Sequence, residues 1–242
     1  MENTPGIDSN PEQSAISLLN KRAESIQSSV KAISQEKKQE LKDTIGNFSQ
    51  KFSGGILVGG DALRVWLDKK EFFVPEEFGN DIDFIMDKAS FDKAKSFFNS
   101  ENQSELGYRK KGLKENEQEF NKDPENYMAL EDNKNFRHID VFVGKEPFEK
   151  TDYQGIKLNI IQPEELFIKY ANKAKDELEK GQIQRRTLTY YYLSSLIVDK
   201  QKLDSKIQQA NSGRGTNIDW ESEVKNLDAK IQQTKITEEV IH

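Results

Sequence analysis

Two six-residue segments, DIDFIM at 81–86 and HIDVFV at 138–143, constrain the fold of this chain most strongly. Polar and apolar residues alternate in both, which is the pattern of a β-strand with one face against a core. A third apolar run, ILV at 56–58, is bounded by Gly54-Gly55 and Gly59-Gly60 and predicts a short buried strand. The sequence therefore predicts a sheet built from segments that lie far apart along the chain.

Helical patterns surround these strands. Apolar side chains recur at helical spacing through residues 14–53, with a break in phase after Ile33, and predict two amphipathic helices or one bent helix. We expect these to pack on the core, with a partner-binding helix as the alternative. Pro163 opens a second helical region, which Gly181 interrupts. The expected organisation is a disordered tail at 1–13, N-terminal helices at 14–53, a core at 54–162 and a helical C-terminal region at 163–242.

Two segments near the C-terminus resemble each other, LDSKIQQ at 203–209 and LDAKIQQ at 227–233. The turn-forming residues 211–215 lie between them, so we expect an antiparallel helical hairpin. Two copies are too few for a solenoid, and chance similarity between charged amphipathic helices is the preferred explanation.

The amino-acid composition limits the kinds of catalysis and metal binding that are open to this chain. The 242 residues include no cysteine and two histidines, His138 and His242. This excludes disulfides, thiol catalysis, cysteine-based metal sites and a histidine-rich metal site. A bound metal must therefore be held by carboxylates, which favour hard ions such as Mg²⁺. The formal charge of −6 argues against a broad nucleic-acid-coating surface. No apolar run is long enough for a membrane span or a signal peptide, so we expect a cytoplasmic protein without membrane association.

Carboxylates occupy the polar side of the two alternating strands. Asp81 and Asp83 are two residues apart and share one face of their strand, and Asp140 shares a face of the later strand with His138. Adjacent carboxylates repel each other, and a divalent cation would offset that repulsion. Solvated acids on an exposed strand face are the alternative. If the two strands are neighbours, three carboxylates converge into the ligand set of a two-metal phosphoryl-transfer site.

Gly59-Gly60 follows the first strand and opens a helical stretch. Glycines at such a turn let backbone N–H groups approach a phosphate, although the same turn is common for purely structural reasons.

The order of these features resembles the nucleotidyltransferase superfamily of the polymerase β type. GGDALRVWLDKK and NDIDFIMD are similar to AbiEii-like toxins and related minimal nucleotidyltransferases, and IDVFV and PEELFIKYANKA extend the similarity over roughly residues 54–198. The resemblance implies an α+β fold, with a nucleotidyltransferase-type mixed sheet flanked by helices, a helical N-terminal extension and a helical C-terminal region.

The resemblance also implies roles for individual residues. Asp81 and Asp83 would bind two Mg²⁺ ions, and Asp140 would complete one metal site and help to deprotonate an acceptor hydroxyl. The phosphate-binding candidates are Gly59, Gly60, Arg64 and Lys169. The alternative for Arg64 is an ion pair with a purely structural role. The alternative for Lys169 is a solvated charge on the helix surface. The implied reaction moves a nucleoside monophosphate from an NTP, such as ATP, to a tRNA, a protein or a small molecule. A toxin-type enzyme with an antitoxin partner is a further implication.

Three departures from the family pattern keep other interpretations open. Asp61 stands where relatives often have Ser or Thr, FFVPEEFG at 72–79 lengthens the spacer, and Arg185-Arg186-Thr187 replaces an Arg/Lys-Asp pair. The alternative function is a catalytically degenerate homologue that acts as an interaction module through its helical flanks. A Ca²⁺ site is disfavoured because the ligand-rich loop of an EF-hand is absent.

Three further features have structural and functional interpretations. We expect His138 to make an ordinary hydrogen bond rather than to tune Asp140, and at least two of Tyr190–Tyr192 to pack internally rather than to stack on a base. A basic cluster is expected to be solvated, with contact to acceptor phosphates as the alternative, and comprises Arg109, Lys110, Lys111 and Lys114.

Overall fold

The computed structural model describes residues 14–76, 81–99, 108–110, 125–132, 134, 137–214 and 218–237. The expected tail at 1–13 and part of the lengthened spacer, 77–80, lie outside these residues.

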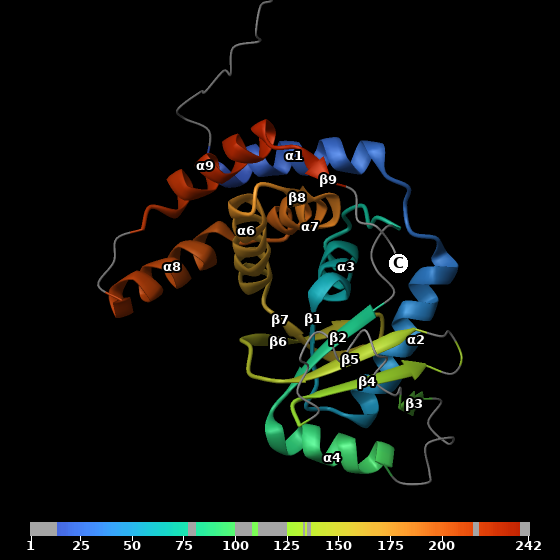
Figure 1. Cartoon of the computed structure of the whole chain (residues 1–242). Coiled ribbons are helices and arrows are strands. Elements are labelled where there is room, and N and C mark those ends of the chain that lie inside the picture. The colour runs from blue at the N-terminus through green and yellow to red at the C-terminus, as the bar shows by residue number, and fades with distance from the viewer. Residues whose placement is uncertain are drawn as a thin grey trace, which may run out of the picture.

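A seven-stranded mixed sheet forms the centre of the described part of the chain (Figure 1). Its strand order is β3-β4-β5-β2-β1-β7-β6. The strands are β1 (Ile56–Val58), β2 (Asp81–Met86), β3 (Tyr108–Lys110), β4 (Tyr127–Asp132), β5 (His138–Val143), β6 (Phe148–Tyr153) and β7 (Ile156–Ile161). All three strands predicted from apolar patterning, at 56–58, 81–86 and 138–143, have the predicted bounds.

Parallel and antiparallel pairs mix at the middle of the sheet. Strand β2 runs parallel to β5 and antiparallel to β1, and β1 runs parallel to β7. The outer pairs, β3 with β4, β4 with β5 and β6 with β7, are antiparallel. Together with the helices around it, this sheet confirms the predicted α+β class.

Helices cover the sheet and build a second layer above it (Figure 1). They are α1 (Ala15–Ser29), α2 (Gln35–Lys51), α3 (Gly59–Lys69), α4 (Lys88–Asn99), α6 (Pro163–Glu179), α7 (Arg185–Ser195), α8 (Lys200–Arg214) and α9 (Trp220–Gln233). A two-residue parallel pair joins β8 (Ile183–Gln184) to β9 (Ile236–Thr237).

The N-terminal segment forms two helices rather than one bent helix. Ser34 caps α2 by accepting a hydrogen bond from the Lys37 backbone N–H, which fixes the start of the second helix. The linker before it is held in extended form, because Ile33 N donates to Val74 O at 2.9 Å. Helix α1 packs on α7 and α9, whereas α2 packs on β7. Both helices therefore pack on the fold, as expected, but in different layers.

The two C-terminal helices are present, but they do not pack along their lengths as the predicted hairpin. A hydrogen bond from Trp220 Nε1 to Asp204 Oδ1 joins the start of α9 to the start of α8, and the two helices extend in different directions from there (Figure 1). Helix α9 packs on α1 and α6 instead. The reason is that α9 buries Val224 and Ile231 in the main core, which leaves α8 to extend away.

One hydrophobic core runs through both layers. It includes Leu19 of α1, Phe48 of α2, Phe84 of β2 and Tyr191 of α7, all essentially inaccessible to solvent. Among the described helices, none combines the length and the apolar character needed to cross a bilayer.

Candidate functional site

The predicted acidic strands are direct neighbours. Strands β2 and β5 pair in parallel with Asp81 opposite His138 and Asp83 opposite Asp140. Because side chains alternate along a strand, Asp83 and Asp140 lie on the same face. Ile82 and Phe84 point to the other side and are completely buried. The backbone register therefore places two carboxylates next to each other.

Gly59 lies against this carboxylate pair. It follows Val58, which pairs with Asp83, and it adopts a φ of +69° at the start of α3. A Cβ atom at Gly59 would lie 2.3 Å from Asp83 Oδ2, closer than real Cβ contacts come. Only glycine provides both the left-handed backbone and the space for the carboxylate. The sequence related Gly59 and Gly60 to a phosphate, and did not indicate this contact with Asp83.

The environment of Asp83 disfavours its charged form. Burial raises the pKa of Asp83 to about 7, and the charges of Asp140, Asp61 and Asp81 act in the same direction. The positive charge of Arg186 opposes them. A carboxylate held in this way is a good ligand for a hard cation, because the cation would offset both the lost hydration and the repulsion.

Asp140 is held by a tyrosine that the sequence did not single out. Tyr127, at the start of β4, donates a hydrogen bond from its Oη to Asp140 Oδ1 at 2.7 Å. The rings of Tyr127 and Phe142 pack with their centroids 5.2 Å apart, which orients the phenol. The strand pairing that brings Tyr127 to Asp140 is tertiary, so no local sequence signal pointed to it.

Asp81 is the most exposed of the three predicted carboxylates, with 51% of its side chain accessible. Its Oδ1 lies 3.9 Å from Nδ1 of His138, and the other imidazole nitrogen lies 4.0 Å from Glu131 Oε2. His138 thus lies between two acids, Asp81 and Glu131.

The three carboxylates do not form a closed metal cage. In the described part of the chain, no group of three or more acidic or imidazole side chains is arranged closely enough to hold a metal ion. Asp83 and Asp140 nevertheless fit a hard divalent ion by their chemistry, since both offer carboxylate oxygens side by side on one sheet face.

Asp61, the unusual residue after the glycines, is buried in an ion pair. Its Oδ1 accepts a 2.6 Å hydrogen bond from Nη1 of Arg64, one turn later on α3. Burial raises the pKa of Asp61, while Arg64 and Arg137 act to lower it. Arg64 was predicted either to bind phosphate or to form a structural ion pair, and in the structure it forms the ion pair with Asp61.

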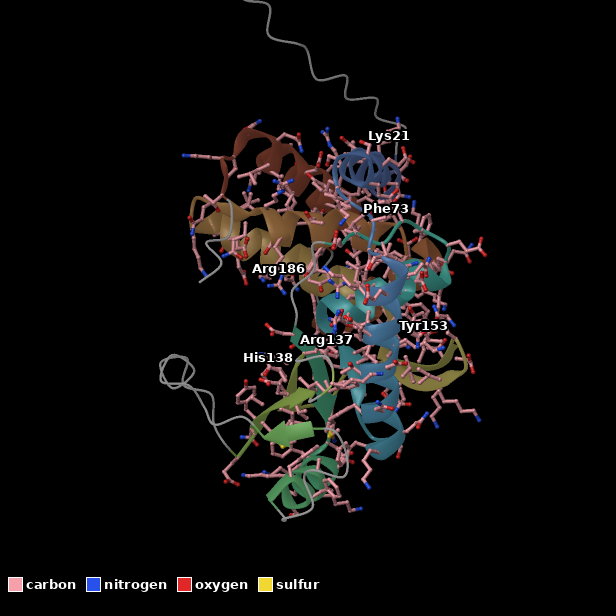
Figure 2. The ribbon with its side chains drawn as sticks, turned by 90° about the vertical axis from the view of Figure 1, so that its right-hand side faces the viewer. Lys21, Phe73, Arg137, His138, Tyr153 and Arg186 are labelled. Carbon is pink, nitrogen blue, oxygen red and sulfur yellow. The ribbon has the colours of Figure 1, made fainter. Side chains whose placement is uncertain are left out.

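Lys169 and Arg186 differ in how they relate to the carboxylates. The Lys169 ammonium forms a 2.5 Å ion pair with Glu146, outside the carboxylate group. Arg186 lies on the side of the helical layer that faces the sheet, above Arg137 and His138 (Figure 2). Its Nε donates to Tyr190 Oη at 3.0 Å, and its charge acts on Asp83. The sequence marked Arg186 only as a departure from the family pattern.

The remaining candidates are the tyrosine run and the basic cluster. Tyr190, Tyr191 and Tyr192 are all buried, which confirms internal packing. The side chains of the predicted basic cluster lie outside the described set. Two cavities, of about 450 Å³ beside α8 and about 630 Å³ beside β6 and β7, are not lined by any candidate residue.

Comparisons with known proteins give structural similarity only. No protein-family model and no curated protein sequence matches this chain. A solution structure of the antibiotic-resistance factor ANT(2'')-Ia is similar with a TM-score of 0.48 at 12% identity, over 75% of this chain and 95% of that one. A crystal structure of ANT(2'')-Ia with adenylyl-2''-tobramycin has a TM-score of 0.48 at 11% identity, over 74% and 99%.

A third similar structure is an antigenic nucleotidyltransferase-like protein from Paracoccidioides brasiliensis, with a TM-score of 0.47 at 12% identity. It covers 86% of this chain and 97% of that one. At these scores and identities, the similarities carry no information about the activity of this chain.

Proposed function

We propose that this protein is a Mg²⁺-dependent nucleotidyltransferase, which transfers a nucleoside monophosphate from an NTP to an acceptor hydroxyl. The observation that carries the proposal is the register of β2 and β5, which sets Asp83 opposite Asp140 beside the glycine turn. Paired carboxylates next to a strand–glycine–helix turn suit a reaction in which metal-bound phosphates react in line.

Each residue has a distinct role in this proposal. Asp83 and Asp140, with Asp81 at the exposed end of β2, would hold the Mg²⁺ ions. Bound Mg²⁺ supplies charge neutralisation at the phosphates. The acceptor oxygen bonds to the α-phosphorus, the bond from that phosphorus to pyrophosphate breaks, and Asp140 helps to accept the hydroxyl proton. Tyr127 keeps Asp140 oriented through its 2.7 Å hydrogen bond. Gly59 and Gly60 let the backbone approach the triphosphate.

The acceptor is proposed as a class, an alcohol on a tRNA, a protein or a small molecule. The test incubates the protein with Mg²⁺, each of the four α-labelled NTPs, and three acceptor pools: total tRNA, a protein lysate and aminoglycosides. We expect label transfer to one pool, and its loss by at least about 100-fold in Asp83→Asn and Asp140→Asn. A tRNA acceptor would favour a toxin-type enzyme, for which growth arrest on expression and rescue by a neighbouring gene are the next measurements.

A matched control keeps this test specific. Asp87→Asn changes a carboxylate that directly follows the same strand but caps α4, where it accepts from Ser90. This variant should retain transfer. If the wild-type protein neither transfers label nor gains thermal stability with Mg²⁺ and NTP, the enzymatic proposal is wrong.

The second candidate is a catalytically degenerate protein that acts through its helical flanks. The buried Asp61–Arg64 pair supports it, since it engages Arg64, one of the predicted phosphate-binding residues, in a structural ion pair. Nucleotide-dependent stabilisation separates the two candidates, because a ligand that binds only the native state raises its stability.

A further inference from the structure

Three buried polar groups around the carboxylates lack hydrogen-bond partners within the described part of the chain. They are Asp61 Oδ2, Tyr170 Oη, and the Nε and Nη1 atoms of Arg137. Each belongs to a residue that is more than nine-tenths buried. Buried polar groups are nearly always satisfied by protein, water or ligand, so a cluster of unsatisfied ones is a place where water or a polar ligand completes the hydrogen bonding.

The unsatisfied groups share one electrostatic environment. Arg137 immediately precedes β5, and its charge acts on Asp61. Tyr170 comes from α6 in the helical layer, where its ring packs edge-on against Tyr190 with centroids 5.1 Å apart. Asp83 and Arg186 both act on the Tyr170 hydroxyl. Electrostatic interactions therefore connect these groups with Asp61 and Asp83, from the sheet and from the helices.

Two arginines, Arg137 and Arg186, supply positive charge beside the carboxylates. Arg64 already neutralises Asp61 through their 2.6 Å ion pair. Arg137 adds a buried positive charge at the start of β5, and the partly buried Arg186 adds a second positive charge from α7 in the helical layer (Figure 2). Lys169, the cation expected from the family resemblance, is paired with Glu146. Arginine is well suited to a phosphate, since its planar guanidinium donates two parallel hydrogen bonds.

We infer that Arg137 and Arg186 form a two-sided site for the terminal phosphates of the nucleotide, Arg137 from the start of β5 and Arg186 from the helical layer. This inference rests on the proposed function, because it assigns the triphosphate of that same substrate to residues outside the family pattern. The site selects a chain of phosphates over a monophosphate, since two cations in different layers need an anion that reaches both. Ligand binding would also tie the helical layer to the sheet.

The test measures binding of inorganic tripolyphosphate by calorimetry, with Mg²⁺ present and absent. Arg137→Met and Arg186→Met should each weaken binding about 10- to 100-fold, the loss expected for a charge-assisted hydrogen bond. Lys173→Met, which removes an exposed cation one turn after Lys169 on α6, should change affinity less than about twofold. AMP binding should change little in either arginine variant.

Two further variants keep the test decisive. Arg137→Lys retains the buried positive charge. It should bind tripolyphosphate more tightly than Arg137→Met does. If Arg137→Met is unfolded, Arg137→Lys should instead bind within about 10-fold of the wild type. Arg186→Lys should restore part of the affinity lost in Arg186→Met. The inference is overturned if both methionine variants bind as wild type does, or if Lys169→Met alone removes the affinity.

Failure of the inference is distinguishable from failure of the proposed function. Tripolyphosphate binding that depends on the arginines, without label transfer by the wild type, would contradict the enzymatic activity and support the anion site. Label transfer with an NTP KM that is unchanged in both arginine variants would support the activity and contradict the anion site.

Discussion

At the scale of single residues, the contact between Gly59 and Asp83 determines the geometry of the site. The left-handed backbone of Gly59 and the 2.3 Å approach that a Cβ would make to Asp83 Oδ2 are separate constraints. Gly155 also has a positive φ, of +87°, but nothing lies within 4 Å of the position of its Cβ. The two glycines therefore allow strain and close contact to be measured separately.

Gly59→Ala should lower the free energy of unfolding by more than Gly155→Ala does. A left-handed non-glycine residue costs about 1–3 kcal/mol, and this applies to both variants. Only Gly59→Ala also displaces the Asp83 carboxylate, so it alone should weaken Mg²⁺ binding. Urea unfolding and a Mg²⁺ titration measure the two effects. Equal losses of stability and unchanged Mg²⁺ affinity would contradict the contact.

The raised pKa of Asp83 predicts a pH dependence of stability in the metal-free protein. Its pKa rises from 3.8 to about 7 on folding, so between these values the folded state binds more protons than the unfolded state. Stability must then fall as the pH rises through this window. The full effect corresponds to about 4 kcal/mol, since one pKa unit is about 1.36 kcal/mol.

Asp83→Asn should therefore stabilise the metal-free protein near pH 8 and have little effect below about pH 4. Urea unfolding at both pH values, in the presence of a chelator, measures the difference. Asp87→Asn is the control of opposite sign, because hydrogen bonds from Ser90 lower the pKa of Asp87. Added Mg²⁺ should stabilise the wild type and not Asp83→Asn. A gain of equal size at both pH values would mean that Asp83 is not held in the environment described here.

At the scale of elements, a buried carboxylate on α9 joins three helices that are distant in sequence. Asp228 accepts a 2.7 Å hydrogen bond from Tyr192 Oη of α7 and a 3.3 Å bond from Arg22 Nη2 of α1. Gln232 donates to the same tyrosine oxygen at 3.1 Å. These contacts explain why α9 leaves α8 and packs against α1.

Asp228→Ala should destabilise the protein by about 1–3 kcal/mol, because the buried Tyr192 hydroxyl loses its acceptor. Tyr192→Phe should cost less, and the double variant should cost less than the sum of the two single variants. Chemical denaturation of the three variants gives the coupling free energy. Strict additivity would show that the hydrogen bond contributes nothing to the packing of α9.

At the scale of the whole molecule, the sheet and the helical layer share one hydrophobic core. Leu19 of α1 belongs to this core although α1 does not touch the sheet strands closely. The two tryptophans report on different layers, since Trp66 lies on α3 and donates to Ile161 O, whereas Trp220 lies on α9.

A core substitution in one layer should therefore lower the stability of both layers. In a Trp220→Phe background, where Trp66 is the sole fluorescent tryptophan, Leu19→Ala should lower the free energy of unfolding by about 2–4 kcal/mol. Fluorescence and far-UV circular dichroism should give the same transition midpoint. A midpoint for Trp66 that does not move would show that the layers unfold separately.

Local pattern was sufficient for the strands that carry the acids. Alternation in DIDFIM and HIDVFV fixes which side chains share a face, because the strand repeat is two residues. The helical spacing of apolar residues through 14–53 likewise predicted the helices α1 and α2. These features depend on interactions within a few residues, so they can be predicted from the sequence alone.

Contacts between distant segments were decided only by the tertiary structure. The bond from Tyr127 to Asp140, the exposure of Asp81, the pairing of Lys169 with Glu146 and the position of Arg186 above the sheet all depend on how layers pack. The predicted hairpin failed for the same reason, since α9 gains more from the shared core than from α8. The sequence by itself determined which residues can carry chemistry, and the packing of the two layers decided which of them meet, because burial and charge pairing act between residues that are not neighbours in the chain.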